Sequence, residues 1–73
     1  MANSVPRAFG LRVRAFRVKA GYSQEELAAR SGLHRTFIGR IERGETNITL
    51  INIHRVAHGL GVAPSALFGE MQH

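Results

Sequence analysis

The sequence predicts an all-α domain built from five short helices. Apolar residues recur at intervals of three and four, which is the period of a helix with one buried face. Glycines stand where these periodic stretches end, and no stretch alternates between apolar and polar residues as a half-buried strand does. The 73 residues suffice for one domain with one core. We expect a flexible N-terminal tail over residues 1–6, the helical domain over residues 7–69, and a C-terminal tail over residues 70–73.

The first helix is expected over residues 7–20, and Gly21 ends it because glycine adopts the left-handed conformation at little cost. Ser23 and Glu26 have the spacing of a capping box, which predicts the start of a second helix. Gly32 ends that second helix. The face of the first helix that points inward should contain Phe9, Val13, Phe16 and Ala20, followed by Leu27 and Ala28 of the second helix.

A third helix is expected over residues 35–43, and Gly44 stops it. Thr49 is a suitable N-cap for a fourth helix that ends at Gly61. Pro64 suits the first turn of a short fifth helix that runs through Phe68. The inward face of the fourth helix is predicted to contain Leu50, Ile53, Val56, Ala57 and Leu60.

The charge of the chain indicates a polyanionic partner. Ten Lys and Arg residues stand against five Asp and Glu, a formal net charge of +5, and nine of the ten cations are Arg. The guanidinium group is planar and weakly hydrated, and it suits phosphates and the edge of guanine. The partner is therefore expected to be nucleic acid or an acidic membrane face. Cysteine is absent, so neither a disulfide framework nor a thiolate metal site is expected.

The third helix has two distinct faces. At about 100° per residue, Arg35, Thr36, Gly39, Arg40 and Arg43 fall within about 140° of the helix circumference. The remaining residues are Phe37, Ile38, Ile41 and Glu42, and they fill the opposite side. A cationic face on the second helix of a helix-turn-helix is typical of a helix that enters the DNA major groove. A basic face that is merely solvated is the alternative interpretation.

The residue types on this face suggest separate tasks. Arg35 stands at the helix start and can donate two hydrogen bonds to O6 and N7 of guanine. Thr36 can contact a thymine methyl or a phosphate, and Arg40, one turn later, can contact a second base. Arg43, near the helix end, is expected to bind phosphate, which positions a protein without reading sequence. Gly39 removes bulk in the middle of this face.

The residues that carry these patterns also resemble a known family. The chain is similar over about residues 9–68 to phage-repressor-like (XRE-type) helix-turn-helix regulators, and most similar to controller proteins of restriction–modification systems. Those controllers are small homodimeric transcription factors. The resemblance rests on Ser23-Gln24-Glu25-Glu26-Leu27-Ala28, Gly32-Leu33, His34-Arg35-Thr36-Phe37-Ile38, Ile41-Glu42-Arg43-Gly44, Asn47-Ile48-Thr49 and Ala57-x-x-Leu60-Gly61-Val62.

The resemblance implies further roles. Gln24 would contact a DNA phosphate and support the first base-reading residue, and Asn47 would lie near the DNA backbone together with Arg43. Arg17 of the first helix would pair with Glu42, which accounts for a carboxylate on the inner face of the third helix.

Some positions depart from the family pattern. His34 stands where the family usually has a better N-cap, so we expect it to exchange capping for a phosphate contact. Phe37 stands where controllers often have Tyr, and it would lie at the DNA backbone without a hydroxyl contact. Leu11 and Val18 form an outer apolar stripe on the first helix, for which drift is the simplest explanation.

Other chemistry is less well supported. His54 and His58 have a spacing that can bind zinc, but no third ligand stands nearby in the sequence. The first helix could be interpreted as a basic amphipathic membrane helix, yet its apolar residues are those that the core requires. No motif of an enzyme active site is present, so we expect neither catalysis nor a cofactor, metal or small-molecule ligand.

The sequence therefore predicts a DNA-binding transcriptional regulator, a homodimer on a pseudo-palindromic operator in the bacterial cytoplasm, associated with the nucleoid when bound. An antitoxin or phage-type repressor of the same fold is one alternative, and a protein-interaction module that uses the Leu11–Val18 stripe without DNA is another. No membrane partner is expected. The candidates for the dimer interface are Ile51, Leu67 (unless it belongs to the core), Phe68 and Met71.

Overall fold

The computed structural model describes residues 5–69 of the chain. These residues form four α-helices and one 3₁₀ helix: α1 (Val5–Ala20), α2 (Gln24–Ser31), α3 (Arg35–Glu42), α4 (Leu50–Leu60) and η1 (Pro64–Leu67). The all-α prediction is confirmed, but the expected fifth α-helix is a 3₁₀ turn. The segment Pro64–Leu67 has only four residues, which is too short for a series of i to i+4 hydrogen bonds. It therefore forms the tighter 3₁₀ turn, whose bonds join residues three apart.

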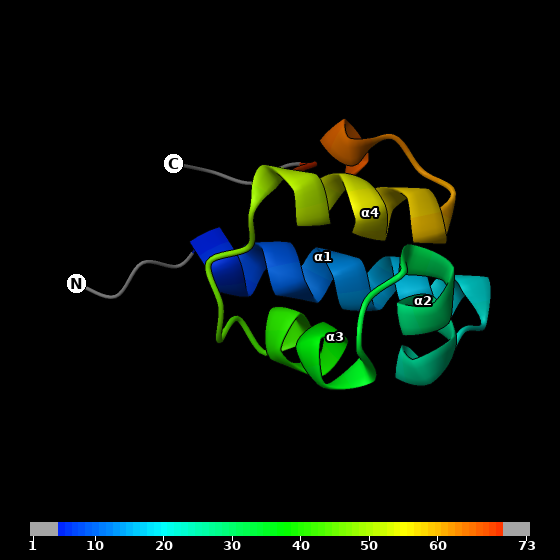
Figure 1. Cartoon of the computed structure of the whole chain (residues 1–73). Helices are drawn as coiled ribbons and strands as arrows, with labels where there is room; N and C mark the ends of the chain where they lie inside the picture. Colours follow the sequence, from blue (N-terminus) through cyan, green and yellow to red (C-terminus); the bar gives the residue numbers. More distant parts are fainter. Residues whose placement is uncertain (1–4, 70–73) are drawn as a thin grey trace.

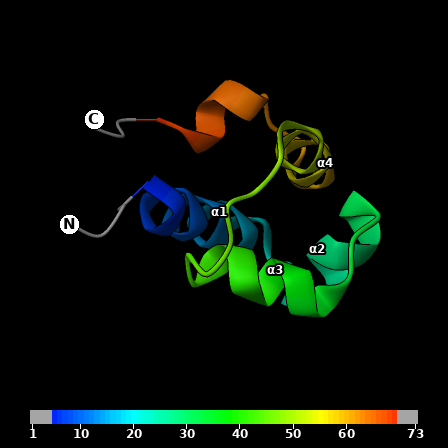
Figure 2. The same ribbon diagram turned by 60° about the vertical axis from the view of Figure 1, so that its left-hand side comes forward.

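The longest helix, α1, runs through the middle of the molecule, with α4 on one side and α3 on the other (Figure 1). Helix α2 packs against both α4 and α3 and closes one end of the bundle. The second view shows that η1 lies beside α4 and α1, on the side away from α3 (Figure 2). The arrangement leaves the outer side of α3 uncovered.

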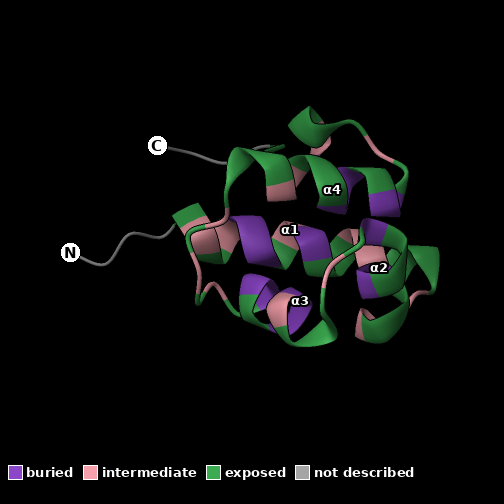
Figure 3. Ribbon diagram, in the orientation of Figure 1, coloured by how far each residue is buried: buried purple, intermediate pink, exposed green. Residues whose placement is uncertain are grey.

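The core lies where the four helices face one another, and buried residues follow their inner sides (Figure 3). Leu67 is 0% exposed and belongs to this core, which was the alternative to a place at the dimer interface, so its side chain is not available to a partner subunit. Met71, another C-terminal candidate for the dimer interface, lies outside the described residues. The buried apolar residues are Phe9, Val13, Leu27, Ala28, Ile38, Ile41, Val56, Ala57, Leu60 and Leu67.

The helix boundaries follow the predicted caps closely. The Ser23 hydroxyl accepts a hydrogen bond from the backbone N–H of Glu26 at 2.9 Å, and the Glu26 carboxylate accepts from the N–H of Ser23 at 3.4 Å, which confirms the capping box. Thr49 caps α4 by accepting from the N–H of Asn52 at 3.2 Å. Gly61 ends α4 in the left-handed conformation. Local sequence signals therefore set where α2 begins and where α4 begins and ends.

Two expectations near the helix starts are wrong. Helix α1 begins at Val5, inside the segment expected to be a tail, because Pro6 is tolerated in the first turn, where no backbone N–H is needed. Leu50 is 82% exposed, although it was predicted to point inward. It is the first residue of α4, and helical side chains lean toward the N-terminus, so its side chain extends past the end of the core.

Two glycines allow helices to approach closely. A Cβ at Gly10 in α1 would overlap the carbonyl oxygen of Ile41 and lie 2.8 Å from that of Glu42. The last turn of α3 thus rests directly on the backbone of α1. Between α2 and α4, the buried hydroxyl of Ser31 fills the space that a Cβ at Gly59 would need. The contact at Gly10 therefore sets how closely α3 lies against α1.

Candidate nucleic-acid interface

Helix α3 presents its cationic face to solvent, as its sequence periodicity predicts. Arg35, Thr36 and Arg40 are exposed, and so is Arg43, which caps the helix C-terminus. The opposite side contributes fully buried apolar side chains, Ile38 and Ile41, to the core. Since the apolar side fixes the rotation of the helix about its axis, the cationic side is held pointing away from the molecule.

His34 begins this helix in a way that sequence reasoning missed. Its Nδ1 accepts a hydrogen bond from the backbone N–H of Thr36 at 3.0 Å, so His34 is the N-cap, contrary to the expectation that it would give up capping. A ring that accepts at Nδ1 carries its hydrogen on Nε2. That second nitrogen is a donor on an exposed residue next to Arg35.

The start of α2 and the exposed face of α3 together enclose an open hollow of about 430 Å³. Gly39 forms part of its floor and is buried, because Gln24 and Arg43 cover it. A Cβ added there would lie 3.0 Å from Nη1 of Arg43. Every residue that lines the hollow is polar, charged or glycine: Ser23, Gln24, Glu25, Arg35, Thr36, Gly39 and Arg43.

A buried ion pair supports this face from within. Arg17 of α1 donates two hydrogen bonds to the Glu42 carboxylate, from Nε at 2.6 Å and from Nη2 at 3.0 Å. Gln24 donates a third from its amide at 3.0 Å, a contact that the sequence did not reveal. The Glu42 side chain is only 3% exposed, so these donors replace the water that its charge has lost. The hydrogen bond to Glu42 raises the pKa of Arg17, so this guanidinium stays charged.

Two of the exposed arginines are paired with carboxylates on the surface. Nη1 of Arg35 lies 3.3 Å from a carboxylate oxygen of Glu25, and Nε of Arg43 lies 3.0 Å from one of Glu45. The hydrogen bond from Arg43 lowers the pKa of Glu45 and raises that of Arg43, so both remain charged near neutral pH. Both pairs are exposed to solvent, and such pairs are weak and screened by salt. Neither pair was predicted from the sequence.

This geometry agrees with the comparisons with known proteins. The family model described as "Helix-turn-helix" matches residues 13–67, which is most of the chain and includes the whole site. The chain belongs to the helix-turn-helix family. Its α2 and α3 are therefore the two helices of the motif, and α3 stands where such a motif has its recognition helix.

Comparison with individual proteins shows which helix-turn-helix proteins this chain is similar to. The chain is 46% identical over 68 residues to control protein C.BamHI of Bacillus amyloliquefaciens, covering 92% of this chain and 84% of the relative. It is 35% identical over 71 residues to control protein C.MunI of a Mycoplasma species, covering 96% of each. The crystal structure of the restriction-modification controller protein C.AhdI from Aeromonas hydrophila matches with a TM-score of 0.88 and 42% identity, over 90% of this chain and all of that one.

Two further residues predicted at the DNA backbone, Asn47 and Phe37, lie outside the exposed cationic face of α3. Asn47 is exposed in the loop between α3 and α4, beyond the end of the recognition helix. Phe37 is only half exposed, and its ring packs against the core. Because a phenyl ring has no hydrogen-bonding group, Phe37 can support the position of α3 but cannot donate to a phosphate.

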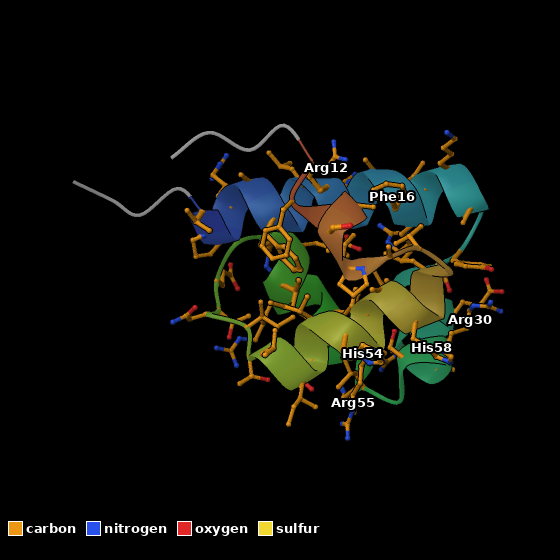
Figure 4. The ribbon with its side chains drawn as sticks, turned by 90° about the horizontal axis from the view of Figure 1, so that it is seen from above. Arg12, Phe16, Arg30, His54, Arg55 and His58 are labelled. Carbon is orange, nitrogen blue, oxygen red and sulfur yellow. The ribbon has the colours of Figure 1, made fainter. Side chains whose placement is uncertain are left out.

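Other cationic side chains of the helix-turn-helix domain hold the fold together. Arg12 donates to the backbone oxygen of Ala66 at 2.8 Å and lies over the Phe16 ring, which fastens η1 to α1. Arg30 of α2 donates to the oxygen of Gly59 at 2.8 Å and lies over the ring of Tyr22. Figure 4 shows both arginines from the α4 side of the molecule, away from the recognition helix.

The same view shows His54, Arg55 and His58 on α4 (Figure 4). Within residues 5–69, no group of three or more metal-ligating side chains comes together, so the two histidines have no third ligand from that part of the chain. None of the described helices combines the length and the apolar character that a membrane span requires.

Proposed function

We propose that this chain is a restriction–modification controller: a transcription factor that binds duplex DNA through α3. One observation carries the proposal. The recognition helix has a solvent-facing side of three arginines and one threonine, and a buried side that fixes its orientation. The bidentate contact of an arginine or lysine with guanine is the commonest specific contact in the major groove. The similarity to controller proteins over nearly the whole chain supports the same assignment.

The residues divide into base readers and backbone contacts. Arg35, Thr36 and Arg40 would meet base edges, because they occupy the exposed side of the first turns of α3. Arg43 and Asn47, at the far end, would bind phosphates. His34, at the start of α3, and Gln24, at the start of α2, would also bind phosphates, each through an identified donor. His34 offers Nε2, and Gln24 retains one amide hydrogen after bonding to Glu42.

A homodimer would place two recognition helices in successive major grooves, about 34 Å apart, on a pseudo-palindromic operator. Exposed apolar side chains available for such an interface are Ile51 of α4 and Phe68 after η1, which are 68% and 38% exposed. Phe68 also lines a small hollow together with Val5, Ile48 and Ile53.

In vitro selection of bound duplexes tests the function directly. We expect the purified chain to enrich a two-fold-related sequence, and a footprint on the selected duplex should protect two half-sites about one helical turn apart. No enrichment over a random pool would overturn the proposal. The controller assignment has its own test in the neighbouring genes. A methyltransferase or endonuclease gene is expected there, whereas a toxin gene would favour an antitoxin of the same fold.

A further inference from the structure

Glu25 belongs to the first turn of α2, where the helix dipole favours an acidic residue, but it also stands at the candidate DNA interface. It lines the same hollow as Arg35, Thr36 and Arg43, where the DNA would approach. A carboxylate at this position repels phosphates and weakens binding to any duplex. The neighbouring Glu26 points elsewhere, because its carboxylate closes the capping box of α2. The dipole of α2 explains an acid in this turn, and the contact that Glu25 makes across to α3 points to a second role.

The contact of Glu25 identifies its target as Arg35. One carboxylate oxygen of Glu25 lies 3.3 Å from Nη1 of Arg35, and within residues 5–69 no other hydrogen bond to this guanidinium is present. Nε and Nη2 therefore stay available, and a guanidinium has five N–H groups in a fixed fork. Arg35 can keep its contact with Glu25 and still donate two hydrogen bonds to a guanine.

The position of Arg35 in its helix gives the pair a second purpose. Arg35 is the first residue of α3, where the helix dipole is positive and a cation is disfavoured. The Glu25 carboxylate offsets this field. It also competes with phosphate oxygens, which are the acceptors that an unrestrained arginine would choose on DNA of any sequence.

We propose that Glu25 is a positioning residue that raises the sequence specificity of Arg35. It orients the guanidinium toward base edges and makes phosphate a poorer alternative partner. The inference rests on the proposed DNA-binding function. The side chains of Arg35 and Glu25 are 67% and 75% exposed, so the pair is weak and its effect on affinity is small. Glu25 therefore tunes the preference for cognate over unrelated DNA and does not prevent binding.

The test compares two duplexes, the strongest one selected by the parent protein and a scrambled duplex of equal length and composition. Affinities are measured by fluorescence anisotropy at one fixed salt concentration. Glu25→Gln should tighten binding to the scrambled duplex by a few-fold, up to about fivefold, which is the range of an exposed ion pair. Binding to the selected duplex should change less, so the ratio of the two affinities falls.

Two matched variants remove the same charge elsewhere. Glu26→Gln keeps the capping box, because glutamine can serve at that position, and it should leave the affinity ratio unchanged. Glu45→Gln frees Arg43, which we assign to phosphate, so it should tighten binding to both duplexes alike. If Glu25→Gln gave the same ratio as the parent, or only as large a change as Glu26→Gln, the inference would be wrong.

A double-mutant cycle separates positioning from a general effect of charge. If Glu25 acts through Arg35, then adding Glu25→Gln to Arg35→Ala should leave the affinity ratio where Arg35→Ala alone puts it. A further fall in the ratio would show that Glu25 acts on DNA by itself and would overturn the proposal. A parent protein that binds both duplexes equally would refute the proposed function instead. Circular dichroism melting of each variant establishes that the fold is intact.

Discussion

Arg35 and Arg43 lie at opposite ends of one helix face, and their surroundings assign them different tasks. Both border the polar hollow, but Arg35 is the first residue of the recognition helix, while Arg43 follows its last turn and pairs with Glu45. The start of a recognition helix reaches base edges, whereas its end lies nearer the backbone. Two chemically identical side chains should thus differ in what they contribute to specificity.

Replacement of each arginine by alanine tests this difference. Arg35→Ala should cost on the order of 1–3 kcal/mol on the selected duplex and relax the preference at one base position. Arg43→Ala should weaken binding to all sequences alike and reduce the slope of log K against log salt by about 1. Anisotropy titrations at several salt concentrations measure both effects. A base-selective loss in Arg43→Ala would contradict the phosphate assignment.

The buried carboxylate of Glu42 makes Arg17 a residue of the fold and not of the interface. Arg17→Ala should destabilise the domain by about 3–5 kcal/mol, because it leaves a desolvated charge without its main partner. Since the pairing raises the pKa of Arg17, the contribution is complete at neutral pH and would fade only at strongly alkaline pH. Urea unfolding measures the loss, with exposed Arg14→Ala on the same helix as the control. Equal unfolding midpoints for Arg17→Ala and the parent would argue against the pair.

At the scale of the elements, the contact between α1 and α3 depends on Gly10. Alanine in place of a glycine within a helix normally stabilises it by roughly 0.5–1 kcal/mol. Here the added methyl would strike the carbonyl groups of Ile41 and Glu42, which belong to the backbone and cannot rotate away. Gly10→Ala should therefore destabilise the fold by about 1–3 kcal/mol, the cost of overpacking.

Thermal melting of Gly10→Ala shows the sign of the effect, and Leu11→Ala at the adjacent exposed position provides the comparison. We expect the Leu11 variant to stay within about 0.5 kcal/mol of the parent. A Gly10→Ala protein more stable than the parent would mean that the two helices lie further apart than the structure shows.

Helix boundaries proved predictable because their causes are local. Ser23, Glu26 and Thr49 act within three residues of the backbone groups that they cap, so their spacing in the sequence is enough. The two faces of α3 were predictable for the same reason, since helical periodicity alone separates arginines from isoleucines. The start of α1 was missed because Pro6 is as acceptable in a first turn as in a tail.

The contacts that were missed join residues far apart in the sequence. Neither the bond from Gln24 to Glu42 nor that from Glu25 to Arg35 follows from spacing, because each depends on how α2 crosses α3. The pair of Arg17 and Glu42 was expected only through family resemblance. His34 was missed for a chemical reason, since imidazole caps a helix only in the tautomer with a free Nδ1.

At the scale of the whole molecule, opposite sides have different characters. The outer side of α3 is cationic and faces away from α4, whose first turn exposes Leu50 and Ile51 (Figure 1). A chain of 73 residues buries only about 60% of its unfolded surface, so a second subunit would add substantially to its stability. An apolar contact on a different side from α3 would leave both recognition helices free for DNA.

The oligomeric state tests this arrangement. Ile51→Ser should weaken self-association by about tenfold or more, because it places a hydroxyl in an apolar interface, and its position opposite the core leaves the fold unaffected. Leu11→Ser makes the same chemical change on the outer stripe of α1 and should leave the dimer intact. Sedimentation equilibrium over a range of protein concentrations measures both. The reverse pattern would place the interface on α1. The distance between the two recognition helices of the dimer would then differ, and the operators selected by the parent would lack half-sites one helical turn apart.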